Sequence, residues 1–215
     1  SKLHSPNDFE NITDKIKAKK IIGNLVGENY VVKTLFESKR GNNFENKIIE
    51  KMPKNFVIKF NHNASGALIY RDGYLFDVKN ILFKKKVTYS EESVNYWLKI
   101  AERDNLFSIT REPQYLNIKP RWYIEELLQN GKTIPDDVKV HCIKGVPEFI
   151  YFAIDRENKN TRVITDIDQN IMEIKWEKKY RKSKFSKTFS KLPKNLINEI
   201  IQISRKVSKD YLYIR

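Results

Sequence analysis

A lysine stands beside a run of small and polar residues in the stretch from residue 56 to residue 71. The stretch opens with the apolar Phe56, Val57 and Ile58, continues with Lys59, and passes through residues 61–66 into a second apolar run. This pattern predicts two adjacent strands joined by a small-residue loop. Such a loop lets backbone N–H groups approach an anion, so one interpretation is a phosphate clamp in which Lys59 adds positive charge. The alternative is an ordinary hairpin whose Lys59 points to solvent, because the loop matches neither the P-loop nor the dinucleotide-binding fingerprint.

The charge balance favours anionic partners. The chain of 215 residues carries 41 Lys and Arg against 27 Asp and Glu, which gives a formal net charge of +14. Nucleotides, nucleic acid, sugar phosphates or an anionic membrane face would suit that excess. Because most of the excess is lysine, a solvated lysine-rich surface is the alternative explanation.

Cysteine content and hydropathy indicate the cellular setting. The single Cys142 excludes an internal disulfide and suits a reducing compartment. No stretch approaches the roughly 18 apolar residues of a transmembrane segment. The first residues have no apolar signal core and no starting Met, so we expect a processed, tagged or excerpted chain. We therefore expect a location in the cytoplasm or at the inner face of the membrane.

The elements around Lys59 are predicted from periodicity and capping residues. A helix is predicted from Asp14, with Thr13 as its N-cap and Gly27 as its stop. A second helix follows Ser90, which can cap it, and extends to about residue 102. The remaining predictions in this part of the chain are strands at 31–36 and 122–128 and a short helix at 44–52.

The C-terminal part of the chain predicts a hairpin and one amphipathic helix. The hairpin spans residues 138–155 with Lys144 and Gly145 as its turn, and further strands are predicted at 162–167 and 211–215. Pro193 is expected at the first turn of the helix. One buried face of that helix is predicted from the spacing of Leu196, Ile200, Ile203 and Val207. The predicted fold is α+β, with mixed or antiparallel strands and packed helices in two lobes on either side of a hinge near Glu126.

Residues 180–191 form a strongly basic run that also contains Phe185 and Phe189. Basic residues with interspersed aromatics could bind nucleic acid, but the chain has no recognised nucleic-acid motif. A surface loop is the favoured interpretation, and we expect no nucleic-acid partner. The polar run 111–121 contains two prolines and is predicted to be a loop that presents side chains.

Five motifs in order resemble one family. They lie at residues 12–16, 56–66, 117–121 and 124–128 and at 137–139 with the following Lys144 and Gly145 turn. Together they resemble the TupA-like branch of the ATP-grasp superfamily over nearly the whole chain. The resemblance implies an ATP-grasp-like fold and an enzyme that activates a carboxylate with ATP as an acyl phosphate, which an amine then attacks. It also implies a setting in bacterial surface polysaccharide and polypeptide assembly.

The resemblance assigns roles residue by residue. Lys59 is similar to the strand lysine that contacts ATP phosphates, and Ser65 and Gly66 to the loop that closes over them; Asn63 and Ala64 replace glycines that the family usually has there. The hinge that holds adenine corresponds to Glu125, Glu126, Leu127 and Leu128, and the strand that flanks the nucleotide to Asp137 or Lys139. Candidate contacts to an anionic substrate are His62, Arg121 and Arg156. Arg215 resembles a catalytic arginine near the transferred phosphate.

The resemblance implies ATP and magnesium as cofactors. In the superfamily the carboxylates that hold magnesium follow the segment that Tyr213, Ile214 and Arg215 resemble, so no metal ligand is assigned within these residues. Phosphoryl transfer depends strongly on the metal, and we expect the 215 residues alone to bind nucleotide without turnover.

The function implied by the resemblance is an ATP-dependent carboxylate–amine ligase in capsule or cell-surface polysaccharide biosynthesis. Its expected substrates are a small carboxylate, such as a uronic or amino acid that is free or nucleotide-linked, and an amine. The alternatives are a glycosyltransferase that uses an anionic sugar nucleotide and a basic nucleic-acid-binding module. The expected division is an N-terminal segment, 1–53, a first lobe, 54–124, and a second lobe, 125–215.

Overall fold

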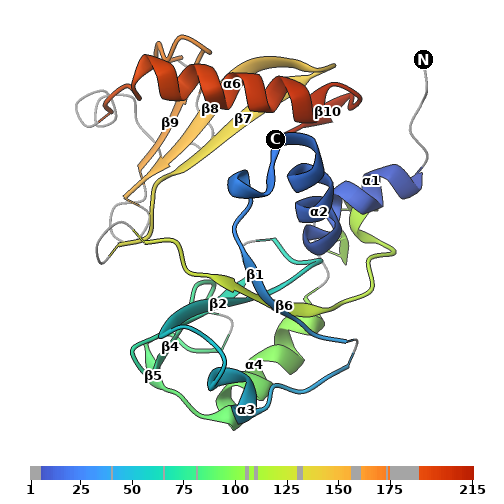
Figure 1. Cartoon of the computed structure of the whole chain (residues 1–215), viewed down its shortest axis with the longest axis vertical. Coiled ribbons are helices and arrows are strands. Elements are labelled where there is room, and N and C mark those ends of the chain that lie inside the picture. The colour runs from blue at the N-terminus through green and yellow to red at the C-terminus, as the bar shows by residue number, and fades with distance from the viewer. Residues whose placement is uncertain are drawn as a thin grey trace. The chain divides into compact units, whose positions relative to one another are not determined.

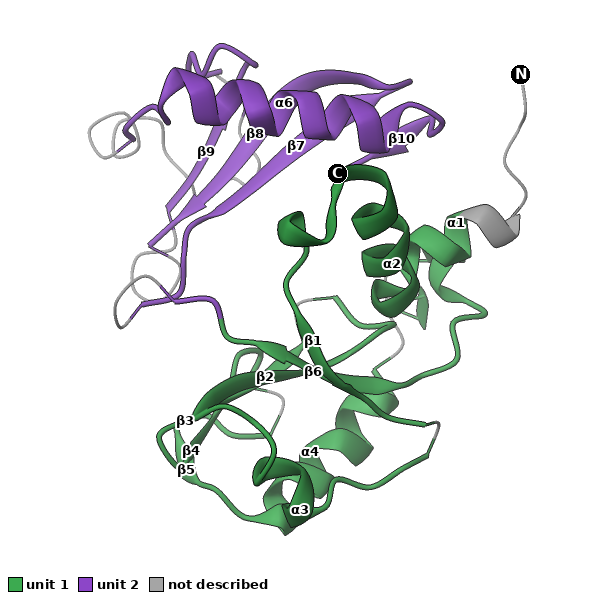
Figure 2. Cartoon of the chain, in the orientation of Figure 1, with its two compact units in different colours: residues 1–127 green, residues 128–215 purple. Residues whose placement is uncertain are grey.

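The computed structural model describes residues 6–39, 41–64, 66–80, 82–104, 107–108, 111–129, 133–155, 161–172, 174 and 189–215. The chain divides into two compact units, residues 1–127 and residues 128–215, which Figure 2 shows in green and purple. The boundary lies within the predicted hinge, and residues 1–53 belong to the same unit as residues 54–124. Among the described residues no helix is long and apolar enough to cross a membrane.

Unit 1 is built on an antiparallel sheet with the strand order β1-β6-β2-β3-β4-β5 (Figure 1). Every neighbouring pair of strands in this sheet is antiparallel. Its elements are α1 (Pro6–Thr13), α2 (Lys15–Val26), η1 (Glu28–Tyr30), β1 (Thr34–Glu37), α3 (Asn46–Ile49), β2 (Asn55–Phe60), β3 (Ala67–Arg71), β4 (Tyr74–Asp77), β5 (Val87–Thr88), α4 (Glu91–Glu102), η2 (Pro113–Tyr115) and β6 (Trp122–Glu126).

Helix α4 covers one face of the unit 1 sheet and defines its hydrophobic core. Ser90 caps the helix, and its side chain accepts a hydrogen bond from the Ser93 N–H, as the sequence predicts. Buried residues of α4 pack against inward residues of β2 and β6: Val94, Trp97, Leu98 and Ala101 against Phe56, Ile58, Phe60, Trp122 and Ile124. Because side chains alternate along a strand, Lys59 and Glu125 point to the opposite face.

Unit 2 repeats this plan with a second antiparallel sheet in the order β10-β7-β8-β9. Its elements are β7 (Asp137–Ile143), β8 (Val146–Ile154), β9 (Thr161–Thr165), α6 (Lys194–Ser208) and β10 (Tyr213–Ile214). Helix α6 lies across one face of the sheet (Figure 1) and packs on a core that includes Cys142, Ile150 and Phe152. The predicted turn is confirmed, because Lys144 and Gly145 have positive φ values of 50° and 80° between β7 and β8.

The α+β prediction is confirmed, but two helix details differ from the sequence interpretation. The N-cap of α2 is Asp14, because its carboxylate accepts hydrogen bonds from the Ile16 and Lys17 N–H groups; Thr13 ends α1 instead. Pro193 is the N-cap of α6, one position before the predicted place.

The buried face of α6 is also shifted by one residue from the predicted face. Ile197, Ile201 and Ser208 are buried, whereas Leu196 is 40% exposed. The helix has apolar residues on two adjacent stripes, and periodicity alone could not say which stripe contacts the sheet. Ile200, which belongs to the predicted stripe, packs at the edge of the unit 2 core.

Candidate functional site

Lys59 forms an ion pair with a buried carboxylate on the neighbouring strand. Its Nζ contacts Glu125 Oε1, and the Lys59 side chain is 33% exposed whereas the Glu125 residue is only 6% exposed. Strands β2 and β6 are antiparallel neighbours in which Lys59 lies opposite Tyr123 and Val57 opposite Glu125, so the two side chains are diagonal neighbours on one face. Lys59 is therefore held by an ion pair on the sheet face and does not extend freely into solvent, and its phosphate role stays a prediction.

Helix α2 adds a second lysine to the same carboxylate. Lys19 Nζ lies 2.9 Å from Glu125 Oε2 and 3.0 Å from Thr34 Oγ1. Burial would raise the pKa of Glu125, but its charge interactions and hydrogen bonds with Lys59 and Lys19 hold that pKa below its usual range. Glu125 is thus an ionised carboxylate that fixes two ammonium groups from different elements.

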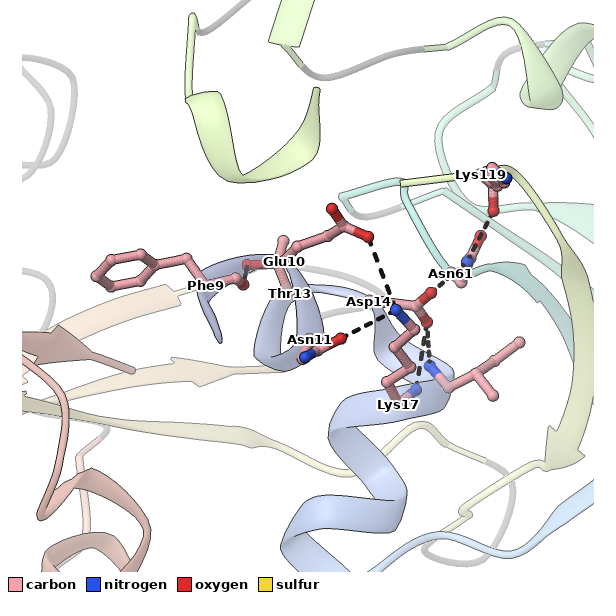
Figure 3. Close-up of polar contacts among 9 residues, drawn as sticks. Phe9, Glu10, Asn11, Thr13, Asp14, Lys17, Asn61 and Lys119 are labelled. Atoms are coloured by element: carbon pink, nitrogen blue, oxygen red, sulfur yellow. Dashed lines mark hydrogen bonds and ion pairs between the residues drawn. The ribbon is translucent and has the colours of Figure 1, made fainter. Parts of the chain in front are cut away.

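The base of the small-residue loop is buried and held by side-chain hydrogen bonds. Asn61 Nδ2 donates to Asp14 Oδ2 at 2.8 Å and to the Lys119 carbonyl at 3.1 Å, as Figure 3 shows. Asn61 Oδ1 accepts from the Arg121 N–H at 2.8 Å. Asn63 Nδ2 donates to the Ala101 carbonyl, also at 2.8 Å. The loop base is therefore attached to α2, to the segment before β6 and to the end of α4.

His62 lies in this buried base and contacts the end of α4. Its Nε2 is 3.1 Å from the Glu102 carbonyl oxygen, and the residue is 2% exposed. Burial, together with the Lys15 charge, lowers the pKa of His62 to about 4, whereas the hydrogen bond to the Glu102 carbonyl opposes the shift. The imidazole is neutral at neutral pH, so it can offer hydrogen bonds but no positive charge to an anionic substrate.

Lys15 brings a third ammonium group to the loop. Its Nζ donates to the Asn63 carbonyl oxygen. Burial, followed by the nearby Lys59 charge, lowers the pKa of Lys15 to about 8, although Asp14 and Glu125 partly oppose the shift. Lys15 and Lys19 were absent from the sequence-based site. Their spacing of four residues places both on one helix face, and that was the available signal.

The cluster of Lys15, Lys19, Lys59, Asp14 and Glu125, which we call the lysine cluster, carries more positive than negative charge. Lysine ammonium groups are flexible point charges that suit phosphate oxygens, and the adjoining loop has the buried Gly66. The arrangement can therefore hold an anion next to the loop. Ser65, which the sequence assigns to phosphate, lies outside the described residues.

Arg121 belongs to a different part of unit 1. Its side chain lines a 480 Å³ cavity beside α4 and residues 41–43, together with Lys99, Tyr96 and Trp122. Neither Lys59 nor Glu125 lines that cavity. A second cavity, of 600 Å³, lies among α2, η1 and β1, and Lys19 and Thr34 are among its lining residues. Of these two cavities, the one formed by α2, η1 and β1 adjoins the lysine cluster through Lys19.

The residues of the predicted hinge have different environments. The Glu125 side chain is buried in the ion pairs, whereas Glu126 is exposed and its N–H donates to the Lys33 carbonyl at 3.1 Å. Leu127 is half-buried and Leu128 is 53% exposed. The Glu126 N–H therefore belongs to the sheet, which leaves Leu127 and Leu128 as the better candidates for backbone contacts to a ligand.

Two predicted site residues of unit 2, Asp137 and Lys139, lie on the face of β7 opposite α6. Lys139 Nζ pairs with Asp137 Oδ2 and lies 5.4 Å from the centre of the Tyr151 ring. Nearby, His141 is stacked on Phe149 with ring centres 4.3 Å apart.

His141 is also tied to the end of the chain, because its Nδ1 lies 2.7 Å from Tyr213 Oη. Burial, together with the charges of Arg215 and Lys139, lowers the pKa of His141 to about 4. Arg215 therefore lies close enough to His141 for its charge to act on the imidazole, whereas Arg156 lies outside the described residues.

Carboxylates that could hold a metal do not gather in the described part of the chain. No group of three His, Cys, Asp or Glu residues there is arranged to bind an ion. Asp166 and Asp168 form an Asp-x-Asp pair, but the Asp166 carboxylate accepts hydrogen bonds from the Asp168 and Asn170 N–H groups and from Asn170 Nδ2. Asp166 therefore closes a turn.

Comparison with protein families identifies one match. The family model described as TupA-like ATPgrasp matches residues 3–215. A search of curated proteins and a search of solved structures each returned no match.

Proposed function

Because the chain belongs to the TupA-like ATP-grasp family, we propose that it binds ATP for an ATP-dependent carboxylate–amine ligase. The observation that carries the proposal lies in unit 1. Lys59 is fixed by the buried Glu125 beside the small-residue loop, within a chain that the family matches from residue 3 to residue 215. Membership in an ATP-grasp family implies ligase-type chemistry; the substrates, the pathway and the individual roles below are our proposals.

The lysine cluster would recognise the ATP phosphates. Lys59 would contact phosphate oxygens directly, since its ammonium group is partly exposed while its position is set by Glu125. Lys19 would hold Glu125 in place from the other side. Preorganised charges of this kind stabilise the negative charge that develops in phosphoryl transfer, because they need not reorient during the reaction.

The reaction would proceed in two steps. A substrate carboxylate oxygen attacks the γ-phosphorus of ATP, the bond to the β-phosphate oxygen breaks, and ADP leaves. The amine then attacks the carbonyl carbon of the acyl phosphate, loses a proton, and displaces inorganic phosphate to leave an amide. Magnesium is the metal that the family implies, but the described residues do not provide a fitting ligand set for it.

The remaining assignments stay predictions. We assign adenine contacts to the backbone of residues 127 and 128 and a nucleotide contact to Asp137 or Lys139. We assign contacts to an anionic substrate to Arg121 and to His62, the latter as a neutral hydrogen-bonding group. Arg215 is assigned to the transferred phosphate. The proposed setting is cytoplasmic assembly of capsule or other surface polysaccharide, with a uronic or amino acid and an amine as substrates.

Hydroxylamine trapping tests the proposed chemistry. The full-length gene product is incubated with ATP, magnesium, hydroxylamine and a panel of uronic and amino acids. An acyl phosphate is converted to a hydroxamate, so we expect hydroxamate and ADP to form together and only with the correct acid. Sugar-nucleotide turnover without ATP would favour a glycosyltransferase, and tight oligonucleotide binding with a steep salt dependence would favour a nucleic-acid-binding module.

A further inference from the structure

Lys15 joins helix α2 to the small-residue loop at two points. Its side-chain Nζ donates to the Asn63 carbonyl, and its backbone N–H donates to the Asn61 carbonyl at 3.1 Å. The Lys15 side chain and its Asn63 acceptor are 48 residues apart in the sequence. A single residue at the start of a helix therefore holds a distant loop.

Asn63 is the last residue of a hydrogen-bonded segment that begins at Asn61 and precedes a run of small residues. Asn61 is fixed by Asp14 and Arg121, and the Asn63 side chain is fixed by Ala101. After Asn63 come small residues that lead into strand β3 at Ala67. The Lys15 ammonium thus acts on Asn63, the last residue of this hydrogen-bonded base that precedes the small residues.

We propose that Lys15 is a positioning residue whose bond to the Asn63 carbonyl, which we call the latch, tightens when a polyphosphate occupies the position beside Lys59. The inference rests on the proposed function, because it names a control of the same phosphate site. Lys15 acts through the loop carbonyl, and Lys59 remains the residue assigned to phosphate contact.

The charges around Lys15 explain why an anion would strengthen the latch. The charged and titratable groups that face Lys15 are Asp14 at the start of α2, Lys59 on β2, His62 in the loop base, Lys79 after β4 and Glu125 on β6. His62 is neutral, and Glu125 is already shared by two lysines. Lys15 is therefore held in a site that disfavours its charge.

Bound phosphate would reverse that penalty. Burial and the Lys59 charge lower the pKa of Lys15 to about 8, so about half of the amine is neutral at pH 8. A polyphosphate next to Lys59 favours the ammonium form of Lys15. Hydrogen bonds from charged donors are stronger than neutral ones, so protonation tightens the bond to the Asn63 carbonyl. Nucleotide binding and proton uptake are thereby linked.

Hydrogen exchange tests the latch directly. Exchange of a peptide covering residues 61–68 is followed by mass spectrometry at pH 7 without ATP, and at pH 8.5 with and without ATP, in the wild type, Lys15→Met and Lys17→Met. Lys17 is the matched control: it lies on α2 and carries the same charge, but its partners are Glu10 and Asn11. Without ATP, Lys15→Met should exchange about tenfold faster than the other two proteins, as expected for a lost charge-assisted hydrogen bond.

With ATP at pH 8.5, where about three quarters of the Lys15 amine is neutral before binding, loop protection should increase in the wild type and in Lys17→Met, and much less in Lys15→Met. Equal loop exchange in all three proteins overturns the latch. If wild-type protein does not bind ATP, the proposed function and the phosphate coupling both fail. The comparison without nucleotide then still decides whether Lys15 holds the loop.

Titration calorimetry in buffers of different ionisation enthalpy tests the proton linkage. At pH 8 the wild type should take up about half a proton per ATP, because a group with a pKa of about 8 is half protonated before binding. Lys17→Met should match the wild type, and Lys15→Met should lose this uptake. Equal uptake in Lys15→Met overturns the linkage.

Lys15→Arg provides a rescue, since arginine stays charged: it should keep the loop protected and show no uptake. If the substitutions at Lys15 prevent folding, the wild type is measured at pH 7 and pH 9.5. Loop protection in the protein without ATP should fall at pH 9.5 relative to the hairpin of β7 and β8, and an unchanged ratio contradicts the proposal.

Discussion

The two units share one packing arrangement and place similar residues on the sheet face that does not contact α4 or α6. Each has an antiparallel sheet with one helix over one face, α4 in unit 1 and α6 in unit 2. Each also has a lysine–carboxylate pair on the other face and a buried histidine whose pKa is lowered to about 4. The difference lies in how far apart in the sequence the paired residues are.

In unit 2 the pair is local. Lys139 and Asp137 are two positions apart on β7, and their side chains are 34% and 31% exposed. In unit 1 the carboxylate of Glu125 joins Lys59 on β2 to Lys19 on α2, and its side chain is 8% exposed. A local pair needs only one strand to form, whereas the pairing in unit 1 requires the tertiary fold. We conclude that the unit 1 carboxylate supports both the structure and the site.

The largest difference is expected on removing each carboxylate. Glu125→Gln leaves two partly buried ammonium groups without their shared counter-charge and should lower the free energy of unfolding by about 3 kcal/mol. Asp137→Asn should lower it by less than about 1 kcal/mol, because exposed ion pairs contribute little. Urea titrations followed by tryptophan fluorescence and circular dichroism give both values. Similar losses for the two variants would remove the distinction between the units.

Acid should destabilise both units through their histidines. The folded pKa values of His62 and His141 are about 4, below the ordinary value of 6.5. The unfolded chain therefore binds these protons first as pH falls, and the free energy of unfolding decreases from pH 6.5 towards pH 4. Each histidine can account for at most about 3 kcal/mol.

Single variants separate the two contributions to the acid sensitivity. His62→Gln and His141→Gln should each flatten part of the dependence of stability on pH in urea titrations between pH 7 and pH 4. Glu125 adds a separate loss at lower pH, because its lowered pKa means that its contribution is present above its unfolded pKa and disappears as the folded carboxylate is protonated. A wild-type stability that is constant from pH 6.5 to pH 4 would be inconsistent with neutral buried histidines.

The smallest difference is expected at two turn glycines. Gly73 and Gly145 both have a φ of 80°, so alanine is strained at either position. A Cβ at Gly73 would meet no atom within 4 Å, whereas one at Gly145 would lie 3.2 Å from the Lys209 Cα. Gly73→Ala should cost about 1 kcal/mol, and Gly145→Ala somewhat more. Thermal melts of the two variants compare the turns, and a greater loss at Gly73 would be contrary to this packing argument.

Local signals in the sequence predicted much of the fold. The capping of α4 by Ser90, the turn at Lys144 and Gly145, and the strand with Lys59 depend on neighbouring residues, and the structure contains all three. The face of α6 was predicted one residue away, because two apolar stripes lie side by side on that helix.

The site was only partly predictable for the same reason. Lys59 could be singled out from its own strand and loop. The contacts from Asp14 to Asn61 and from Lys15 to Asn63 join residues 47 and 48 positions apart, and no local pattern specifies such pairs. Glu125 was assigned to the hinge, but its buried side chain faces Lys59, which only the pairing of β2 with β6 establishes. Long-range contacts therefore account for what the sequence did not indicate.

ATP titration of Lys59→Met tests the central claim, that the lysine cluster of unit 1 binds nucleotide phosphates. Methionine keeps the aliphatic bulk of Lys59 and removes its charge, and Lys17→Met is the control because Lys17 is a lysine of α2 whose partners are Glu10 and Asn11. Calorimetry should show ATP binding to the wild type and Lys17→Met, and at least about tenfold weaker binding to Lys59→Met, a loss of about 1.4 kcal/mol. Thermal melts without ATP check that Lys59→Met is folded. Equal ATP affinity in all three folded proteins would contradict the claim.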